Sequence, residues 1–271
     1  MMKPITPEMD YVKELAGQFD LHGKVALVPG GYGGIGEAIA WGLAIRGAHV
    51  VIGGRSLDKA EALAGKLLGQ GLAASGVVID AHSTASIRSA VDATVAHMGS
   101  INILVNCVGI QREERLLDVT EEAFDEVVQV NLKAAMFLAQ SVARHQIAAK
   151  CGGKHIHLLS VRAHLGLRDR GYSAYCATKG ALVMLVKQHA VELARNSIQV
   201  NGIAPTVVAT EMARHWLDND ATRKQIVERI PLGRVAQPRD VVGAALFFAA
   251  PASDFVTGQI LYLDGGITAS Q

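Results

Sequence analysis

The chain has 271 residues, of which half are hydrophobic and only 5% are aromatic, and its formal net charge is +1. This length accommodates one large α/β domain, and the near-neutral charge excludes a general attraction to nucleic acid or to a membrane surface. No apolar run reaches about 18 residues, and the three cysteines are far apart, so we expect a cytoplasmic protein without a membrane span, a disulfide framework or a metal site.

Residues 1–20 carry scattered charges, and we interpret them as an N-terminal arm before a single domain of residues 21–271. Short apolar runs then alternate with longer amphipathic runs. The short runs predict strands at Lys24–Pro29, Ala48–Gly53, Ala73–Asp80, Ile101–Asn106, His155–Ser160, Ile198–Ala204 and Gln259–Leu263. The longer runs predict helices at Gly34–Gly47, Leu57–Gly69, Thr84–Met98, Glu121–Ala149 (one or two helices), Ser173–Arg195 and Arg239–Ala249. This alternation predicts right-handed crossovers and a parallel sheet.

A glycine-rich loop, Gly30-Gly-Tyr-Gly-Gly34-Ile-Gly36, follows the first predicted strand and opens the first predicted helix. Glycines allow a tight turn and a close approach of the backbone, and a helix N-terminus presents free N–H groups to a pyrophosphate. In this position the loop predicts a dinucleotide site. The alternative is a glycine-rich turn that binds no ligand.

Tyr175 and Lys179 lie four residues apart on the helix predicted to begin near Ser173, where Ser173 is a candidate N-cap. They therefore share one helix face. An ammonium close to a phenol lowers its pKa, which would make Tyr175 an acid and base at neutral pH. The alternative is a packed tyrosine beside a lysine on a solvated face.

The order and spacing of these two motifs resemble the short-chain dehydrogenase/reductase family, and the resemblance extends from Phe19 to Gly266. Asn106-Cys-Val-Gly109, Asn201-Gly-Ile-Ala-Pro205 and Asp264-Gly-Gly266 are similar to further motifs of that family. The resemblance implies an α/β, single-domain Rossmann fold with a doubly wound, seven-stranded parallel sheet and helices on both faces. It also implies a homotetramer.

The resemblance assigns a role to several residues. It implies a catalytic set in which Tyr175 transfers the proton, Ser160 orients the substrate oxygen, Lys179 assists Tyr175 and binds the nicotinamide ribose, and Asn131 holds a relay water. The implied cofactor-binding residues are Gly30, Tyr32, Gly34, Ile35, Gly36, Arg55, Asp80, Asn106, Gly109, Tyr175, Lys179, Pro205, Val208 and Thr210.

The sequence departs from the family pattern at two places that bear on the site. Pro29 precedes the glycine loop where the family has threonine, so one backbone N–H is missing. Ser160 lies fifteen positions before Tyr175, which makes the intervening loop about two residues longer than in the family. The shape of the pocket therefore stays open.

The end of the second predicted strand, Gly53-Gly54-Arg55, has no carboxylate for a ribose 2′-hydroxyl. A guanidinium at Arg55 suits a 2′-phosphate. We therefore predict a preference for NADP(H), with NAD(H) as the alternative cofactor. The competing interpretation is an arginine that only faces solvent.

We expect a small-molecule substrate, and the excess of arginine in the loop between Ser160 and Tyr175, which includes Arg170, predicts that it is anionic. The alternative is a basic loop that only faces solvent. The predicted substrate-binding residues are Arg112, Arg162, His164, Arg168, Tyr172 and Met212. Segment Thr206–Pro231 resembles the substrate-covering loop of the family. Phe19–Leu27 and Ile230–Arg234 resemble bacterial sugar-acid and polyol dehydrogenases of the gluconate 5-dehydrogenase type. The alternatives are a 3-oxoacyl-thioester reductase and a non-catalytic NADP-binding regulator.

Overall fold

The computed structural model describes residues 11–168 and 170–270, and its centre is a seven-stranded, all-parallel sheet in the order β3-β2-β1-β4-β5-β6-β7. The strands are β1 (Val25–Pro29), β2 (His49–Gly54), β3 (Ala74–Val78), β4 (Ile103–Asn106), β5 (Gly153–Leu158), β6 (Ile198–Pro205) and β7 (Ile260–Leu263). The predicted fold class is confirmed, and each predicted strand is present with ends displaced by no more than two residues.

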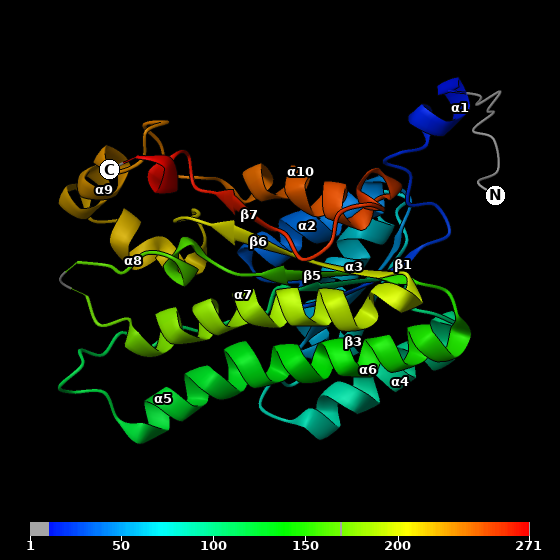
Figure 1. Ribbon diagram of the computed structural model, residues 1–271, viewed down its shortest axis with the longest axis horizontal. Helices are drawn as coiled ribbons and strands as arrows, with labels where there is room; N and C mark the ends of the chain where they lie inside the picture. The colour runs from blue at the N-terminus through cyan, green and yellow to red at the C-terminus, as the bar shows by residue number, and fades with distance from the viewer. Residues whose placement is uncertain (1–10, 169, 271) are drawn as a thin grey trace, which may run out of the picture.

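Helices cover both faces of this sheet, as Figure 1 shows. One face packs against α2 (Gly34–Ile45), α3 (Leu57–Leu68) and α10 (Pro238–Ala249). The other packs against α4 (Thr84–Met98), α6 (Ala134–Ala149) and α7 (Ser173–Leu193). Small residues permit close contacts between these helices. A Cβ on Gly42 of α2, for example, would lie 2.4 Å from Val242 of α10.

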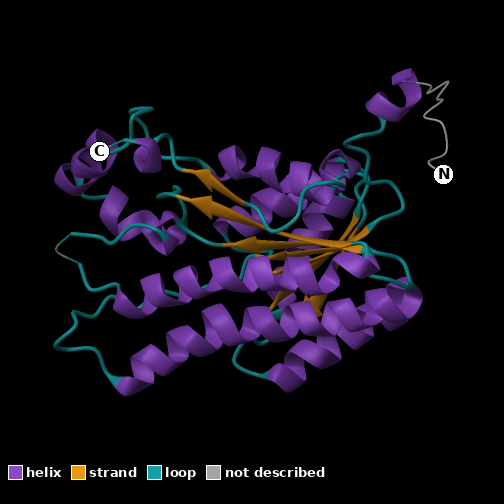
Figure 2. Cartoon of the chain, in the orientation of Figure 1, coloured by secondary structure: helices purple, strands orange, loops and turns teal. Residues whose placement is uncertain are grey.

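The strand order reverses at β1, which lies between β2 and β4. The chain leaves β1 and β4 toward opposite faces, so a crevice opens between the two loops at their carboxyl ends. Cys107, just after β4, donates its N–H to the Pro29 carbonyl at the end of β1 (2.9 Å). The glycine loop and the Asn106 segment are thereby held side by side, at the arrowhead end of the strands in Figure 2.

The other elements lie mainly around this crevice. Segment 206–231 contains a 3-10 turn (Glu211–Ala213), α8 (Arg214–Leu217) and α9 (Asp220–Glu228), and it covers the carboxyl end of the sheet. The predicted helix at Glu121–Ala149 is α5 (Glu121–Val128), a π-helical turn (Gln129–Lys133) and α6. Further single 3-10 turns are Val161–Ala163, Ala194–Asn196, Pro251–Ser253 and Ile267–Ala269.

The predicted N-terminal arm falls partly outside the described residues, because its residues 1–10 are not described. Its remainder contains α1 (Tyr11–Ala16), a short helix that the sequence did not predict, at the end of the molecule opposite α8 and α9 (Figure 1). Among the described helices, none is long and apolar enough to cross a lipid bilayer.

Candidate active site

The N-terminus of α2 is open toward the crevice. Its N-cap is Gly33, which provides no side-chain cap. Helices α3, α4, α5 and α9, in contrast, are capped by the side chains of Ser56, Ser83, Thr120 and Asn219. The first-turn N–H groups of α2 are thus available to an anion, and the helix dipole favours negative charge there. This terminus fits the pyrophosphate of a dinucleotide.

Steric contacts explain why the loop needs glycine. Gly30 has a φ of +75°, and a Cβ there would lie 2.9 Å from the Cys107 backbone. A Cβ on Gly36 would lie 2.2 Å from the Gly30 carbonyl oxygen, and one on Gly34 would lie 2.5 Å from the Thr210 side chain. Thr210 is thus brought against the glycine loop, as expected for a residue beside the cofactor.

Pro29 does not displace this loop. Its carbonyl accepts from Cys107, and the Gly30 N–H that follows donates to the Gly53 carbonyl of β2 (2.8 Å). Because neighbouring backbone groups complete the turn, the missing N–H of Pro29 leaves the loop anchored to both adjacent strands.

Tyr32 explains the missing carboxylate at the end of β2. Its ring lies over Gly54, where a Cβ would come within 2.1 Å of ring carbon Cε1. The Tyr32 hydroxyl accepts from the Ser56 N–H (3.2 Å). A side chain at position 54 would require this ring to move, and the adjacent exposed Arg55 is the charged group at this corner.

Two asparagines organise the loop after β4. The Asn106 side chain accepts from the Val108 N–H (3.1 Å). Asn131, in the π-helical turn, accepts from the Ile110 N–H (2.8 Å) and donates to the Ile110 carbonyl (2.9 Å). Asn131 thus holds the backbone beyond Gly109, and a Cβ on Gly109 would lie 3.6 Å from both Asn131 Oδ1 and Lys179 Nζ.

Ser160, Tyr175 and Lys179 come from the end of β5 and the start of α7. Ser160 is the N-cap of the 3-10 turn after β5, and its Oγ accepts from the Arg162 N–H (3.1 Å). Lys179 is 3% exposed, and its Nζ donates to the Leu158 carbonyl (2.7 Å) and lies 5.6 Å from the Tyr175 ring centroid. The N-cap of α7 is Tyr172 rather than the predicted Ser173.

Ser160 and Tyr175 open into a pocket of about 430 Å³ at the carboxyl end of the sheet. It brings together many predicted residues: Ile35, Pro205, Val208 and Thr210 of the cofactor set, and Arg162, Arg168, Tyr172 and Met212 of the substrate set. The Tyr172 ring packs edge-on against Tyr175, with centroids 5.9 Å apart. Tyr175, which also belongs to the cofactor set, lies in the same wall, whereas the other predicted cofactor residues do not line this pocket.

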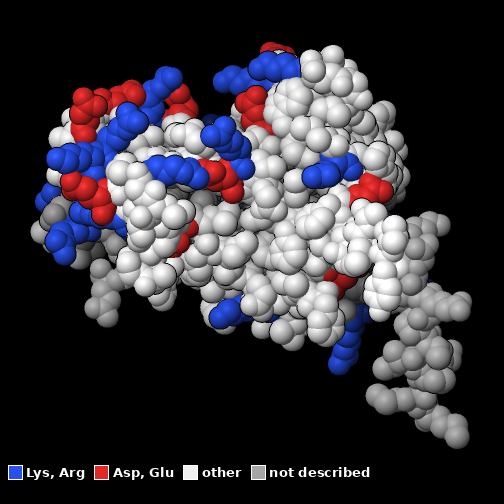
Figure 3. Space-filling view, turned by 90° about the horizontal axis from the view of Figure 1, so that it is seen from above, with Lys and Arg blue, Asp and Glu red and all other residues white. Residues whose placement is uncertain are grey.

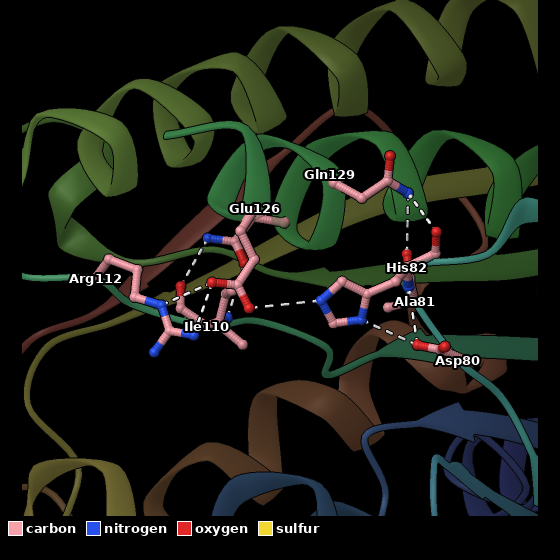
Figure 4. A network of polar contacts seen from close by, with 8 residues as sticks. Asp80, Ala81, His82, Ile110, Arg112, Glu126 and Gln129 are labelled. Carbon is pink, nitrogen blue, oxygen red and sulfur yellow. Dashed lines mark hydrogen bonds and ion pairs between the residues drawn. The ribbon is translucent and has the colours of Figure 1, made fainter. Parts of the chain in front are cut away.

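Arg112 and His164, which were predicted to bind the substrate, are not among the residues that line this pocket, and their assignment stays a prediction. Figure 4 shows Arg112 paired with Glu126 of α5 (2.7 Å). Glu126 also lies 3.6 Å from His82, and His82 in turn pairs with Asp80. The ion pair with Glu126 thus holds the Arg112 side chain against α5, outside the pocket wall. His164 instead packs edge-on against Tyr262, with centroids 6.2 Å apart.

Asp80, predicted to contact the adenine amino group, lies just beyond β3 with its side chain 41% exposed. The pKa of this carboxyl is lowered, first by the hydrogen bond from the His82 N–H and further by the His82 ring and by Arg55. Its charge is therefore held at the edge of the crevice, beside Arg55.

Comparison with known proteins agrees with this geometry. Residues 31–268 match the family model described as enoyl-(acyl carrier protein) reductase. The gluconate 5-dehydrogenase of Gluconobacter oxydans is 38% identical, with 93% of this chain and 97% of that protein covered.

The chain belongs to the short-chain dehydrogenase/reductase family.

Two further relatives match almost the whole length of the chain. The D-threitol dehydrogenase of Mycolicibacterium smegmatis is 36% identical, covering 96% of this chain and 99% of that one. A crystal structure of a gluconate 5-dehydrogenase from Burkholderia cenocepacia, in complex with NADP and tartrate, superposes with a TM-score of 0.91 at 40% identity, covering 95% of this chain and all of that one. As a member of this family, the protein is an NAD(P)-dependent oxidoreductase of CH–OH groups.

Within this short-chain dehydrogenase/reductase, the predicted lowering of the Tyr175 pKa is not observed. The pKa of the Tyr175 phenol is raised to about 12, chiefly by burial, while Ser160 and Arg162 act in the lowering direction. Burial also lowers the pKa of Lys179 to about 8. The sequence prediction considered only the attraction between the two groups, whereas removal from water disfavours the charged form of each.

We therefore expect the two directions of the reaction to differ in their pH dependence. Reduction needs the protonated phenol, which is the dominant form throughout pH 6–9, so its rate should stay nearly constant. Oxidation needs the phenolate, whose small fraction grows about tenfold per pH unit below the pKa. The oxidation rate should rise accordingly, less steeply above about pH 8, where Lys179 loses its proton. Initial rates at saturating cofactor measure this, and an oxidation rate that levels off below pH 7 would contradict it.

The sequence analysis of this short-chain dehydrogenase/reductase missed part of the pocket wall. The lining residues with polar side chains that it did not single out for the site are Gln111, Thr206, Thr222, Gln225 and Arg229, whereas Arg170 belongs to the predicted arginine-rich loop and Trp216 to the predicted substrate-covering loop. Arg170 pairs with Glu113 (3.0 Å), and its guanidinium lies 5.4 Å from the Trp216 ring centroid. The only signal in the sequence was the likeness of Thr206–Pro231 to a substrate-covering loop, which does not say which face of α9 points inward.

Proposed function

We propose that this protein is an NADP(H)-dependent dehydrogenase that interconverts a secondary hydroxyl and a ketone on a sugar acid or polyol. The observation that carries the proposal is the pocket in which Ser160 and Tyr175 share a wall with arginine side chains. Relatives named gluconate 5-dehydrogenase and D-threitol dehydrogenase support this substrate class.

The proposed roles follow from the positions of the side chains. Tyr175 gives a proton to the ketone oxygen in reduction and removes the hydroxyl proton in oxidation. Ser160 orients that oxygen and stabilises charge that develops on it. Lys179 places its positive charge 5.6 Å from the centroid of the Tyr175 ring. Asn131 holds the loop that contains Gly109. The nicotinamide, when bound, accepts or supplies the hydride.

The residues that would hold the cofactor are those of the crevice. The first turn of α2, from Gly34 to Gly36, suits the pyrophosphate, and Lys179 suits the nicotinamide ribose. Arg55 and the ring of Tyr32 form the corner for the adenosine ribose, where the chain has Gly54 and no carboxylate. The structures of relatives solved with NADP support the choice of NADP(H) over NAD(H).

Arg55→Ala should weaken NADP⁺ selectively. A charge-assisted hydrogen bond to a phosphate contributes about 1.5–3 kcal/mol, so kcat/KM for NADP⁺ should fall by at least about tenfold, while that for NAD⁺ changes little. Lys66→Ala, which removes an exposed cation near the far end of α3, is the matched control. Equal catalytic efficiency with the two cofactors in the unmodified enzyme would refute the preference.

The central experiment is an activity screen with NADP⁺ and NAD⁺ over sugar acids, polyols, keto esters and steroids, with a 3-oxoacyl thioester assayed in reduction. The proposal expects turnover of sugar acids or polyols. Turnover of the thioester alone would replace it with a carrier-linked reductase. Cofactor binding without turnover of any alcohol or carbonyl would instead indicate a regulator.

We further propose a single domain over residues 21–271, a cytoplasmic location and a homotetramer. Exposed apolar side chains on α6 and α7, namely Met136, Met184 and Val191, support an interface along these helices. Sedimentation velocity would test the assembly, and a monomer at micromolar concentration would contradict it.

A further inference from the structure

The wall of the pocket has an unbalanced charge. Arg162, Arg168, Arg170 and Arg229 line it, and no aspartate or glutamate does within the described residues. The outer surface differs, because Lys and Arg are interspersed with Asp and Glu at the end of the molecule that carries α8 and α9 (Figure 3). Acidic and basic side chains therefore alternate on this surface, whereas the described residues that line the pocket carry positive charge alone.

Among the described residues, ion pairs compensate one of the four guanidinium groups. Arg170 pairs with Glu113 (3.0 Å). Arg162, Arg168 and Arg229 form no ion pair with any carboxylate of residues 11–168 and 170–270. Within that part of the chain, one negative charge on a substrate would leave two of these three cations unmatched.

Of the four arginines, Arg162 is the closest in sequence to a catalytic residue, because it follows Ser160 by two positions. It is half-buried, and its Nη1 donates to the carbonyls of Leu165 and Gly166, which fixes its direction. Burial lowers its pKa, Tyr172 and Tyr175 act in the opposite direction, and Arg229 of the α9 terminus lowers it further by repulsion. Two like charges that repel one another thus line the same pocket, and an anion bound near both would offset this repulsion.

Two further hydrogen-bond donors in the pocket wall have no acceptor in the part of the chain that the structure describes. The Tyr172 hydroxyl and the Trp216 indole N–H are buried without a hydrogen-bond partner among the described residues. Both can donate, and guanidinium groups can only donate. A ligand rich in acceptors would satisfy them, whereas a neutral polyol brings as many donors as acceptors.

We propose that the substrate is a polyhydroxylated compound with two anionic groups, one held by Arg162 and Arg229 and the other by Arg168; we call such a compound a dianion for its two groups, whatever the charge of each. This inference rests on the proposed dehydrogenase function and narrows its substrate class. The second charge comes from a second carboxylate, as in an aldaric acid, or from a phosphate ester on a sugar acid.

The experiment compares four six-carbon probes with the unmodified enzyme at saturating NADP⁺: sorbitol, gluconate, glucarate and 6-phosphogluconate. We expect kcat/KM for at least one dianion to exceed that for gluconate by about tenfold or more, and this advantage should shrink at high salt. Comparing glucarate with 6-phosphogluconate distinguishes the two sources of charge. Gluconate or sorbitol turning over as well as both dianions would overturn the inference.

Variants test the assignment of the arginines. Arg229→Gln should lower kcat/KM for the preferred dianion by about tenfold, mainly through KM, and that for gluconate by less. Arg162→Lys keeps the charge but loses the fork, and it should also raise KM. The matched control is Arg223→Gln, an exposed arginine on α9 outside this pocket, which should change neither. Equal losses for gluconate and dianion in Arg229→Gln would overturn the assignment.

Calorimetry separates this inference from the proposed function. Binding of glucarate, 6-phosphogluconate and gluconate to the enzyme with NADP⁺ can be measured without turnover. No turnover of any probe would refute the dehydrogenase proposal for these compounds, while tighter binding of a dianion would still support the charge assignment. Binding of gluconate as tight as that of both dianions would overturn it whatever the activity.

Discussion

Tyr175→Phe should lower kcat by about three orders of magnitude in both directions, because general acid–base catalysis by a positioned side chain contributes roughly 10²–10⁴-fold. The variant keeps the ring, which packs against Tyr172 with centroids 5.9 Å apart, and removes only the hydroxyl. Stopped-flow or long steady-state assays with the best substrate of the screen would measure the loss.

Two controls define this result. Binding of NADPH, followed by its fluorescence, should stay within about twofold, because the glycine loop and Arg55 are unchanged. Tyr262→Phe removes a phenol that lies against His164, outside the pocket wall, and should leave kcat unaltered. If Tyr175→Phe turned over at a rate near that of the unmodified enzyme, the proton transfer would have to be assigned elsewhere.

Lys179→Met should lower kcat/KM by about two orders of magnitude with little change in thermal stability. Methionine keeps an unbranched apolar side chain only one atom shorter than that of lysine, but removes the charge that lies 5.6 Å from the Tyr175 ring centroid. Two effects on stability oppose one another. Removing a buried ammonium relieves its desolvation, whereas the Leu158 carbonyl loses its donor at a cost of about 1–3 kcal/mol.

Activity and Tm should be measured on the same preparation. Lys66→Met, an exposed lysine on α3, is the control and should alter neither. A large fall in Tm with proportionate loss of activity would show that Lys179 acts through folding. Unchanged activity would remove it from the catalytic set.

The fold was predictable in most of its detail because its signals are local. Short β-rich apolar runs, each followed by a longer amphipathic run, allow little but a parallel sheet with helices on both faces. Ser56, Ser83 and Thr120 mark helix starts that lie where the pattern placed them. The π-helical turn at Asn131 left no comparable signal, because it depends on how α5 and α6 meet the loop after β4.

By itself the sequence determined the family, the sheet, the glycine loop and the Tyr175–Lys179 pair, since each depends on spacing along the chain. Only the tertiary structure decided the rest. It placed Arg229 in the pocket and turned Arg112 toward Glu126, it laid Tyr32 over Gly54, and it raised the pKa of Tyr175. The physical reason is that ion pairing, steric exclusion and desolvation depend on neighbours that are distant in sequence.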